Sequence, residues 1–211
     1  QDSQSDLDVL AIVENGSGTI PESEILKYVP DKFAHLKLSI SWYGQERLRQ
    51  MFANGELFAW HLFRENIPLH DPTEFLGFLG QPSNYTDAAL DVASFHKVFQ
   101  DIPHQLSKQK ENSVYECGLV YVCLRNISMA ASWNLLAAPD FSRYSIFNLG
   151  RNCPIGKHDF IKTMNCRMSS QRGHPPPDGV DYDYVMGLFD ALNPWIKQLT
   201  LDLDGEDKDG R

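Results

Sequence analysis

Patterns typical of β-strands occur only in the first part of this sequence, and this one-sided distribution is the strongest constraint on the fold. Val9–Val13 is a short, wholly apolar run that stops at Asn15-Gly-Ser-Gly, which predicts a buried strand followed by a turn. Leu36–Tyr43 alternates apolar and other residues and predicts a second strand. Four apolar side chains then share one face of that strand: Leu36, Leu38, Ile40 and Trp42.

Helical spacing covers most of the remaining sequence. In the first part, helices are expected over Glu22–Val29 and Gln45–Glu65, the second divided at Asn54-Gly55. From Thr86 onward no strand pattern occurs. The helices expected there run from about Leu90 toward Lys110 with a break at Pro103, over Ser113–Ala138, over Lys157–Met168, and over Asp183–Leu199 with a kink at Pro194.

The helix that begins at Ser113 is the best marked of these. Ser113 and Glu116 have the spacing of a capping box, in which each side chain bonds a backbone N–H at the start of the helix. The helix is apolar nearly all round, so we expect it at the centre of the second part. These patterns predict an α+β protein. An α/β domain with a small mixed sheet is expected over 1–75, an all-α helical bundle over 84–200 and a charged flexible tail over 201–211, with the Gly- and Pro-rich segment Asp71–Ser83 as the boundary.

Charge and composition exclude several classes of partner. The formal charge of the 211 residues is 19 − 28 = −9, and no basic patch is evident, so neither nucleic acid nor a membrane surface is an expected partner. The densest apolar run, Leu119–Leu124, is far shorter than the roughly 20 residues that a spanning helix needs. Gln1–Asp8 lacks the pattern of a signal peptide. The four cysteines contain no Cys-x-x-Cys pair, which favours reduced core thiols and a cytoplasmic protein over disulfides.

Two acidic residues precede the first strand. Asp6 and Asp8 alternate with Leu7, so both carboxylates project from one face, roughly 6–7 Å apart along the strand. Two carboxylates so placed can bind Mg²⁺, which keeps several waters and takes further ligands from substrate phosphates. The alternative is a pair of solvated acids at the entrance of a strand, because Asp-x-Asp before an apolar run is a common pattern.

Gln1–Val13 resembles the second half of the active-site signature of DNA polymerase β type nucleotidyltransferases, especially the minimal ones of bacteria and archaea. In that family a Gly-Ser pair stands about ten residues before an acid-apolar-acid triplet that leads into a strand. Phe58–Asp71 is similar to the helix that closes such domains, so the resemblance covers roughly Gln1–Pro72. It implies a nucleotidyltransferase domain over 1–75 in which Asp6 and Asp8 bind Mg²⁺ and catalyse transfer, with Ser5 and Ser39 beside them in the nucleotide site.

This sequence departs from the family pattern at two points. The Gly-Ser pair is absent because the chain begins inside the motif, and we expect about 20–40 further residues upstream, one helix and one strand, with Gly-Ser about a dozen positions from Asp6. The family places a third carboxylate on the neighbouring strand, where this chain has Ser39. A serine hydroxyl is neither a carboxylate base nor a strong Mg²⁺ ligand.

The helical part carries a second resemblance. Tyr115–Asn148, with Arg125 and Asn126 near its centre, is similar to the HEPN-type bundles often encoded beside minimal nucleotidyltransferases. Ribonuclease members of that class have Arg, a polar residue and then a His, with about four to six residues between the Arg and the His, a spacing that Arg151 and His158 satisfy. His158 is then a candidate acid or base for RNA cleavage. The alternative is that these residues make polar contacts between helices or across a homodimer.

The leading functional hypothesis is a nucleotidyltransferase that binds Mg²⁺ and an NTP and transfers a nucleoside monophosphate to a hydroxyl of a protein or a small molecule. A second hypothesis is an inactive interaction module of toxin–antitoxin or defence type that has kept the fold and lost the chemistry, as Ser39 suggests. A ribonuclease built on Arg151 and His158 is a third.

Overall fold

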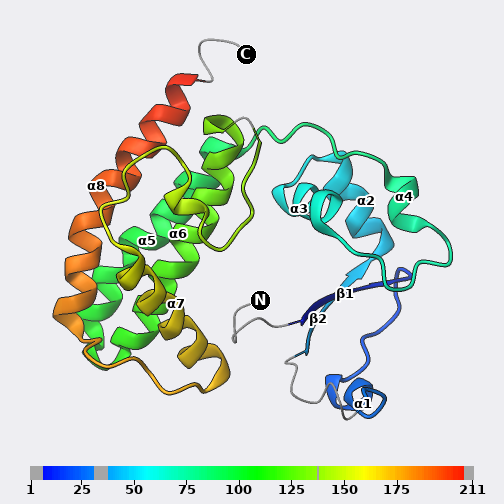
Figure 1. Cartoon of the computed structure of the whole chain (residues 1–211), viewed down its shortest axis with the longest axis horizontal. Coiled ribbons are helices and arrows are strands. Elements are labelled where there is room, and N and C mark those ends of the chain that lie inside the picture. Colours follow the sequence, from blue (N-terminus) through cyan, green and yellow to red (C-terminus); the bar gives the residue numbers. More distant parts are fainter. Residues whose placement is uncertain (1–6, 31–37, 137, 207–211) are drawn as a thin grey trace. The chain divides into compact units, whose positions relative to one another are not determined.

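The computed structural model describes residues 7–30, 38–136 and 138–206. The fold is α+β, mostly helical with one small parallel pair of strands and a helical bundle (Figure 1). The chain divides into two compact units, Gln1–Tyr85 and Thr86–Arg211.

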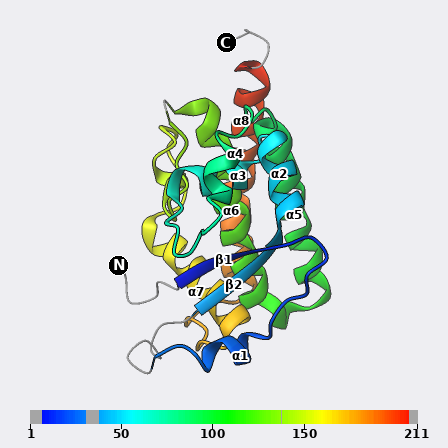
Figure 2. The same ribbon diagram turned by 90° about the vertical axis from the view of Figure 1, so that its right-hand side faces the viewer.

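The N-terminal unit contains the strands. β1 (Leu7–Val13) pairs in parallel with β2 (Leu38–Gly44), from Leu7 opposite Leu38 to Val13 opposite Gly44 (Figure 2). We expected a small mixed sheet, whereas the described residues form this parallel pair alone. Parallel neighbours require a long crossover, and the segment between the two strands, which includes α1 (Glu22–Leu26), supplies it. Leu36, expected in the second strand, lies outside the described residues.

Two helices follow β2 directly, α2 (Gln45–Ala53) and α3 (Leu57–Glu65). They separate at Asn54-Gly55, as predicted, because Gly55 adopts a left-handed φ of +65°. A Cβ at this position would also overlap the carbonyl oxygens of Ser83 and Asn84, so a glycine is required there. A short helix that the sequence pattern did not indicate, α4 (Phe75–Leu79), follows.

The core of this unit lies between the helices and one face of the sheet. Ile12 and Tyr43 pack against the buried side chains of α2 and α3, which are Leu48, Met51, Phe52 and Ala59. Alternate residues of a strand share a face, so Asp8 lies on the same face as Ile12. The opposite face, which carries Ile40 and Trp42, is only half-buried.

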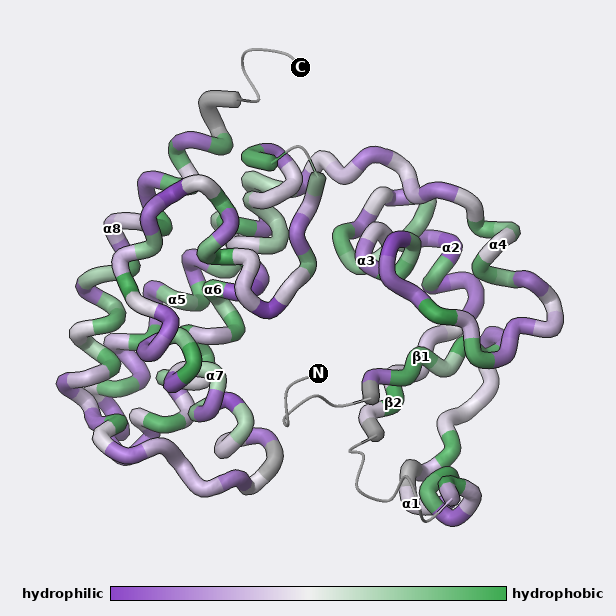
Figure 3. The backbone as a smooth tube through the Cα atoms, viewed as in Figure 1, coloured by the Kyte–Doolittle hydropathy of each residue, from purple (hydrophilic) through white to green (hydrophobic). Residues whose placement is uncertain are grey.

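The C-terminal unit is a bundle of four long helices: α5 (Ala88–Lys108), α6 (Ser113–Leu135), α7 (Lys157–Arg172) and α8 (Tyr182–Glu206). Apolar residues recur along each of them (Figure 3). α6 packs against the other three and is buried nearly all round, which confirms its predicted central position. α5 continues through Pro103 and α8 through Pro194, so neither proline ends its helix. No helix in the described parts of the chain is long and apolar enough to cross a membrane.

The capping box predicted at the start of α6 is wrong. A short 3-10 helix, η2 (Lys110–Asn112), leads directly into α6, so Ser113 already has helical dihedral angles instead of those of an N-cap. Its hydroxyl donates to the carbonyl oxygen of Lys110 at 2.6 Å. Glu116 points into the bundle, where it is 3% exposed and its Oε2 has no hydrogen-bond partner.

The charged tail predicted over 201–211 starts before the last helix has ended. Residues 201–206 continue α8, because the side chain of Leu203 is fully buried. Asp202 accepts a hydrogen bond from Arg151 Nε at 3.1 Å, which joins this end of α8 to the loop before α7. Residues 207–211 lie outside the described residues.

Candidate functional site

Asp8 and Ser39 face each other across the two strands. The register places Asp8 directly opposite Ser39, and both residues are exposed. Neighbouring strands lie about 4.8 Å apart and paired residues project to the same face, so the carboxylate and the hydroxyl are adjacent. The second predicted acid, Asp6, and the predicted nucleotide contact Ser5 lie outside the described residues.

This arrangement supplies one carboxylate ligand and one hydroxyl at the exposed start of the sheet. A carboxylate suits a hydrated Mg²⁺ ion, and a hydroxyl donates a hydrogen bond to a phosphate oxygen. In the part of the chain that the structure describes, no group of three or more His, Cys, Asp or Glu residues is placed to hold a metal ion. A cation at Asp8 would therefore depend on Asp6 and on the oxygens of a bound nucleotide.

Two polar residues predicted in the helical part lie near the centre of α6. Asn126 Nδ2 donates to the carbonyl oxygen of Val122 at 2.8 Å, a bond to its own helix. Arg125 is half-buried, and its buried Nε has no hydrogen-bond partner. The Asn126 bond therefore does not reach a second helix.

The other two predicted residues lie before and at the start of α7. Arg151 forms an ion pair with Asp202, and His158 is exposed in the first turn. No hydrogen bond or ion pair recorded for the described residues joins Arg125, Asn126, Arg151 and His158 to one another. The predicted ribonuclease pair therefore gains no support from direct contact.

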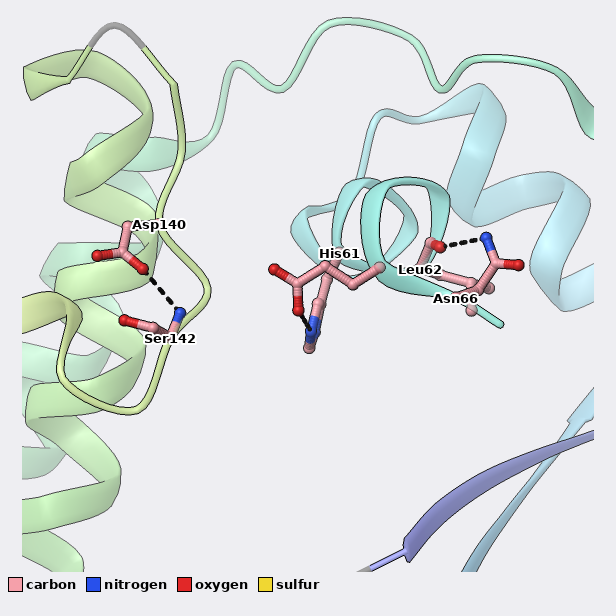
Figure 4. Close-up of polar contacts among 6 residues, drawn as sticks. His61, Leu62, Asn66, Asp140 and Ser142 are labelled. Carbon is pink, nitrogen blue, oxygen red and sulfur yellow. Dashed lines mark hydrogen bonds and ion pairs between the residues drawn. The ribbon is translucent and has the colours of Figure 1, made fainter. Parts of the chain in front are cut away.

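Several polar contacts elsewhere bind neighbouring turns together (Figure 4). On α3, His61 Nε2 lies 3.0 Å from Glu65 Oε2, and just past the end of this helix Asn66 Nδ2 donates to the carbonyl oxygen of Leu62 at 2.7 Å. In the C-terminal unit the backbone N–H of Ser142 donates to Asp140 Oδ1 at 2.8 Å.

The Asp140 carboxyl illustrates how these local bonds act. Burial alone would raise its pKa, but hydrogen bonds from Asn148 and Ser142 outweigh burial and lower it. The ionised carboxylate thus holds the loop after α6 in place, which is a structural role.

Sequence reasoning missed an open pocket of about 330 Å³ in the N-terminal unit. Its lining comes from α2 and from the segment of α4, and consists of Gln45, Arg49, Thr73, Phe75, Phe78 and Leu79. The Arg49 guanidinium lies 5.1 Å from the centre of the Phe75 ring. Glu74, between two lining residues, has a left-handed φ of +51°. No local pattern could indicate this pocket, because its walls come from two separate segments.

No protein family, curated protein or solved structure with which the chain was compared matches it.

Proposed function

We propose that the chain is a nucleotidyltransferase of the DNA polymerase β type that binds Mg²⁺ and an NTP at Asp6 and Asp8. The observation that carries the proposal is the register of the parallel strands, which sets Asp8 beside Ser39 at the exposed start of the sheet. The resemblance of Gln1–Val13 to the family signature supports it, as does the α+β fold with a sheet followed by helices.

In the proposed reaction the two aspartates bind the cation, which would polarise the α-phosphate and neutralise the charge of the departing pyrophosphate. Ser39 donates a hydrogen bond from its hydroxyl to a phosphate oxygen and so orients the nucleotide. The hydroxyl of a protein side chain or a small molecule attacks the α-phosphorus, and the nucleoside monophosphate is transferred. Ser39 cannot take the proton of the attacking hydroxyl, so that proton passes to water.

A second candidate function is an inactive interaction module with the same fold. One observation favours it, namely that a hydroxyl stands opposite Asp8 where the family carries a third carboxylate. Such a module would bind the nucleotide and a partner without transferring the monophosphate.

Calorimetric titration of the full chain with Mg²⁺ and NTP tests the binding site. We expect Asp8→Asn to abolish binding, because the variant removes a ligand charge without changing side-chain size. Glu14→Gln, which neutralises an exposed acid just beyond the other end of β1, is the matched control and should bind like the wild type. Equal binding by wild type and Asp8→Asn would show that the acid is only a surface charge.

Incubation with labelled NTP and cell lysate separates the two candidates. Transfer of label to an acceptor, lost in Asp8→Asn, supports the enzyme. Binding without transfer supports the inactive module, and Ser39→Asp then tests whether a third carboxylate restores activity.

A further inference from the structure

Two buried thiols meet between α6 and α7 in the C-terminal unit. Cys117 on α6 and Cys166 on α7 are fully buried and not joined by a disulfide, and their side chains are in hydrogen-bond contact. They lie far apart in the sequence, on two helices that pack side by side (Figure 1).

The helix backbones approach closely at this point. Gly118 follows Cys117, and a Cβ added to it would lie 2.9 Å from the Cα and N atoms of Arg167 and 3.2 Å from the carbonyl carbon of Cys166. Disulfides need Cα atoms roughly 4.4–6.8 Å apart, a separation that most packed helices exceed. The absence of a side chain at Gly118 therefore lets the two helices approach closely beside the two cysteines, which favours a bond between their sulfurs.

The surroundings favour Cys166 as the attacking sulfur. The Cys117 thiol donates its hydrogen bond to Cys166, which lowers the pKa of Cys166 and raises that of Cys117. Lys162, one turn before Cys166 on α7, adds a positive charge that stabilises a thiolate. The ammonium of Lys162 is held by the carbonyl oxygen of Gly179 at 3.0 Å and lies 4.1 Å from the centre of the Tyr184 ring.

We propose that Cys117 and Cys166 are a peroxide-oxidisable pair that forms a disulfide between α6 and α7. In the first step the Cys166 thiolate attacks hydrogen peroxide, an S–O bond forms as the O–O bond breaks, and hydroxide leaves and is protonated to water. In the second step the Cys117 sulfur attacks the sulfenic sulfur of Cys166, the S–O bond breaks, and a second water leaves with the Cys117 proton. Two thiols are oxidised to one disulfide while one peroxide is reduced to two waters.

The other two cysteines provide matched controls. Cys123 lies on the same helix as Cys117 and is fully buried, but burial and the nearby Glu116 carboxyl raise its pKa to about 12. Cys153 is half-buried, and burial raises its pKa as well. Among the described residues neither Cys123 nor Cys153 is recorded in contact with another thiol, so neither is expected to pair.

The test treats the folded full chain with hydrogen peroxide and then maps its peptides without reduction. We expect free thiols to fall from four to two, a single cross-link between the Cys117 and Cys166 peptides, and reversal by dithiothreitol. Cys117→Ser and Cys166→Ser should abolish the cross-link, whereas Cys123→Ser should leave its yield unchanged. The cross-linked chain should also melt at a higher temperature than the reduced chain, because the bond closes a long loop in the unfolded state.

The peptide map of the wild-type chain decides the matter even if a serine variant fails to fold. Four free thiols after prolonged exposure of the folded chain would overturn the proposal. Cross-links that include Cys123 or Cys153 at a comparable yield would also overturn it, because they would show reaction through unfolding and not through the contact at Gly118.

Discussion

Glu116 is a buried carboxyl whose protonation affects stability. Burial, and then the nearby charge of Asp101, raise its pKa above the ordinary value of 4.5. The folded state therefore binds the proton of the Glu116 carboxyl more tightly than the unfolded state does. The resulting stability is fully present below pH 4.5 and is lost as the pH rises through the folded-state pKa.

We expect Glu116→Gln to make the unfolding free energy less sensitive to pH above pH 4.5. The same variant should have a higher unfolding free energy than the wild type at neutral pH, because the amide carries no charge to desolvate. Chemical denaturation between about pH 4 and pH 8 measures the effect. Glu111→Gln, in the exposed turn before α6, is the control and should follow the wild type. A wild-type pH profile retained in Glu116→Gln would contradict the prediction.

Ser39 stands opposite the Asp8 carboxylate, so a second carboxylate there would be repelled. Ser39→Asp should lower the unfolding free energy without metal by about 0.2–1 kcal/mol, since like charges directly opposite each other destabilise a strand pair. Mg²⁺ should restore part of that loss. Ser41→Asp, which faces Leu10 on the same side of the sheet, is the matched control and should show no such restoration. Thermal melts with and without Mg²⁺ measure both effects, and an equal response of the two variants would count against a cation at Asp8.

At the scale of the elements, the crossing of α6 and α7 depends on the absence of a side chain at Gly118. Gly118→Ala should lower the unfolding free energy by about 1–3 kcal/mol, because a Cβ 2.9 Å from the Arg167 backbone forces the helices apart. Gly187→Ala in α8 is the matched control. Its Cβ meets nothing within 4 Å, so the better helix propensity of alanine should raise stability by up to about 1 kcal/mol. Denaturant unfolding of both variants is the measurement, and effects of the same sign would show that the crossing tolerates a wider spacing.

At the scale of the whole molecule, the extent of the helical unit is set by Leu203. Leu203 is fully buried, whereas Leu201 on the same helix is 55% exposed. Leu203→Ala should cost about 2–5 kcal/mol of unfolding free energy, and Leu201→Ala should change it by less than about 0.5 kcal/mol. Calorimetric melting of the two variants tests the difference, and similar small effects would mean that this turn of α8 does not dock.

Deletion of Gly205–Arg211 removes only residues beyond this last buried leucine. We expect it to change the unfolding free energy by less than about 0.5 kcal/mol, because the segment has no apolar side chain. A large fall in melting temperature would show that the segment contributes contacts of its own.

Local pattern alone predicted most of the elements of this protein. The apolar run Val9–Val13 and the turn at Asn54-Gly55 lie where the sequence placed them, as does the apolar helix that begins at Ser113. Such features depend on residues close in the chain, whose spacing and backbone preferences act before any tertiary contact forms. The alternation of Asp6 and Asp8 before that run also marked Asp8 as a candidate ligand, whereas Ser39 was reached only through the resemblance to the nucleotidyltransferase family.

Tertiary packing decided what local spacing could not. The pairing of Asp8 with Ser39 depends on the strand register, and the contact of Cys117 with Cys166 depends on where two helices cross. Glu116 has the spacing of a cap, yet it is buried because η2 leads directly into α6. Leu203 stands in a charged segment, yet it continues α8 because its side chain finds a place in the core. Except at Glu116, where the adjacent η2 decides, the deciding partner is distant in sequence, so the free energy of burial or pairing across the fold outweighs the preference of the local segment.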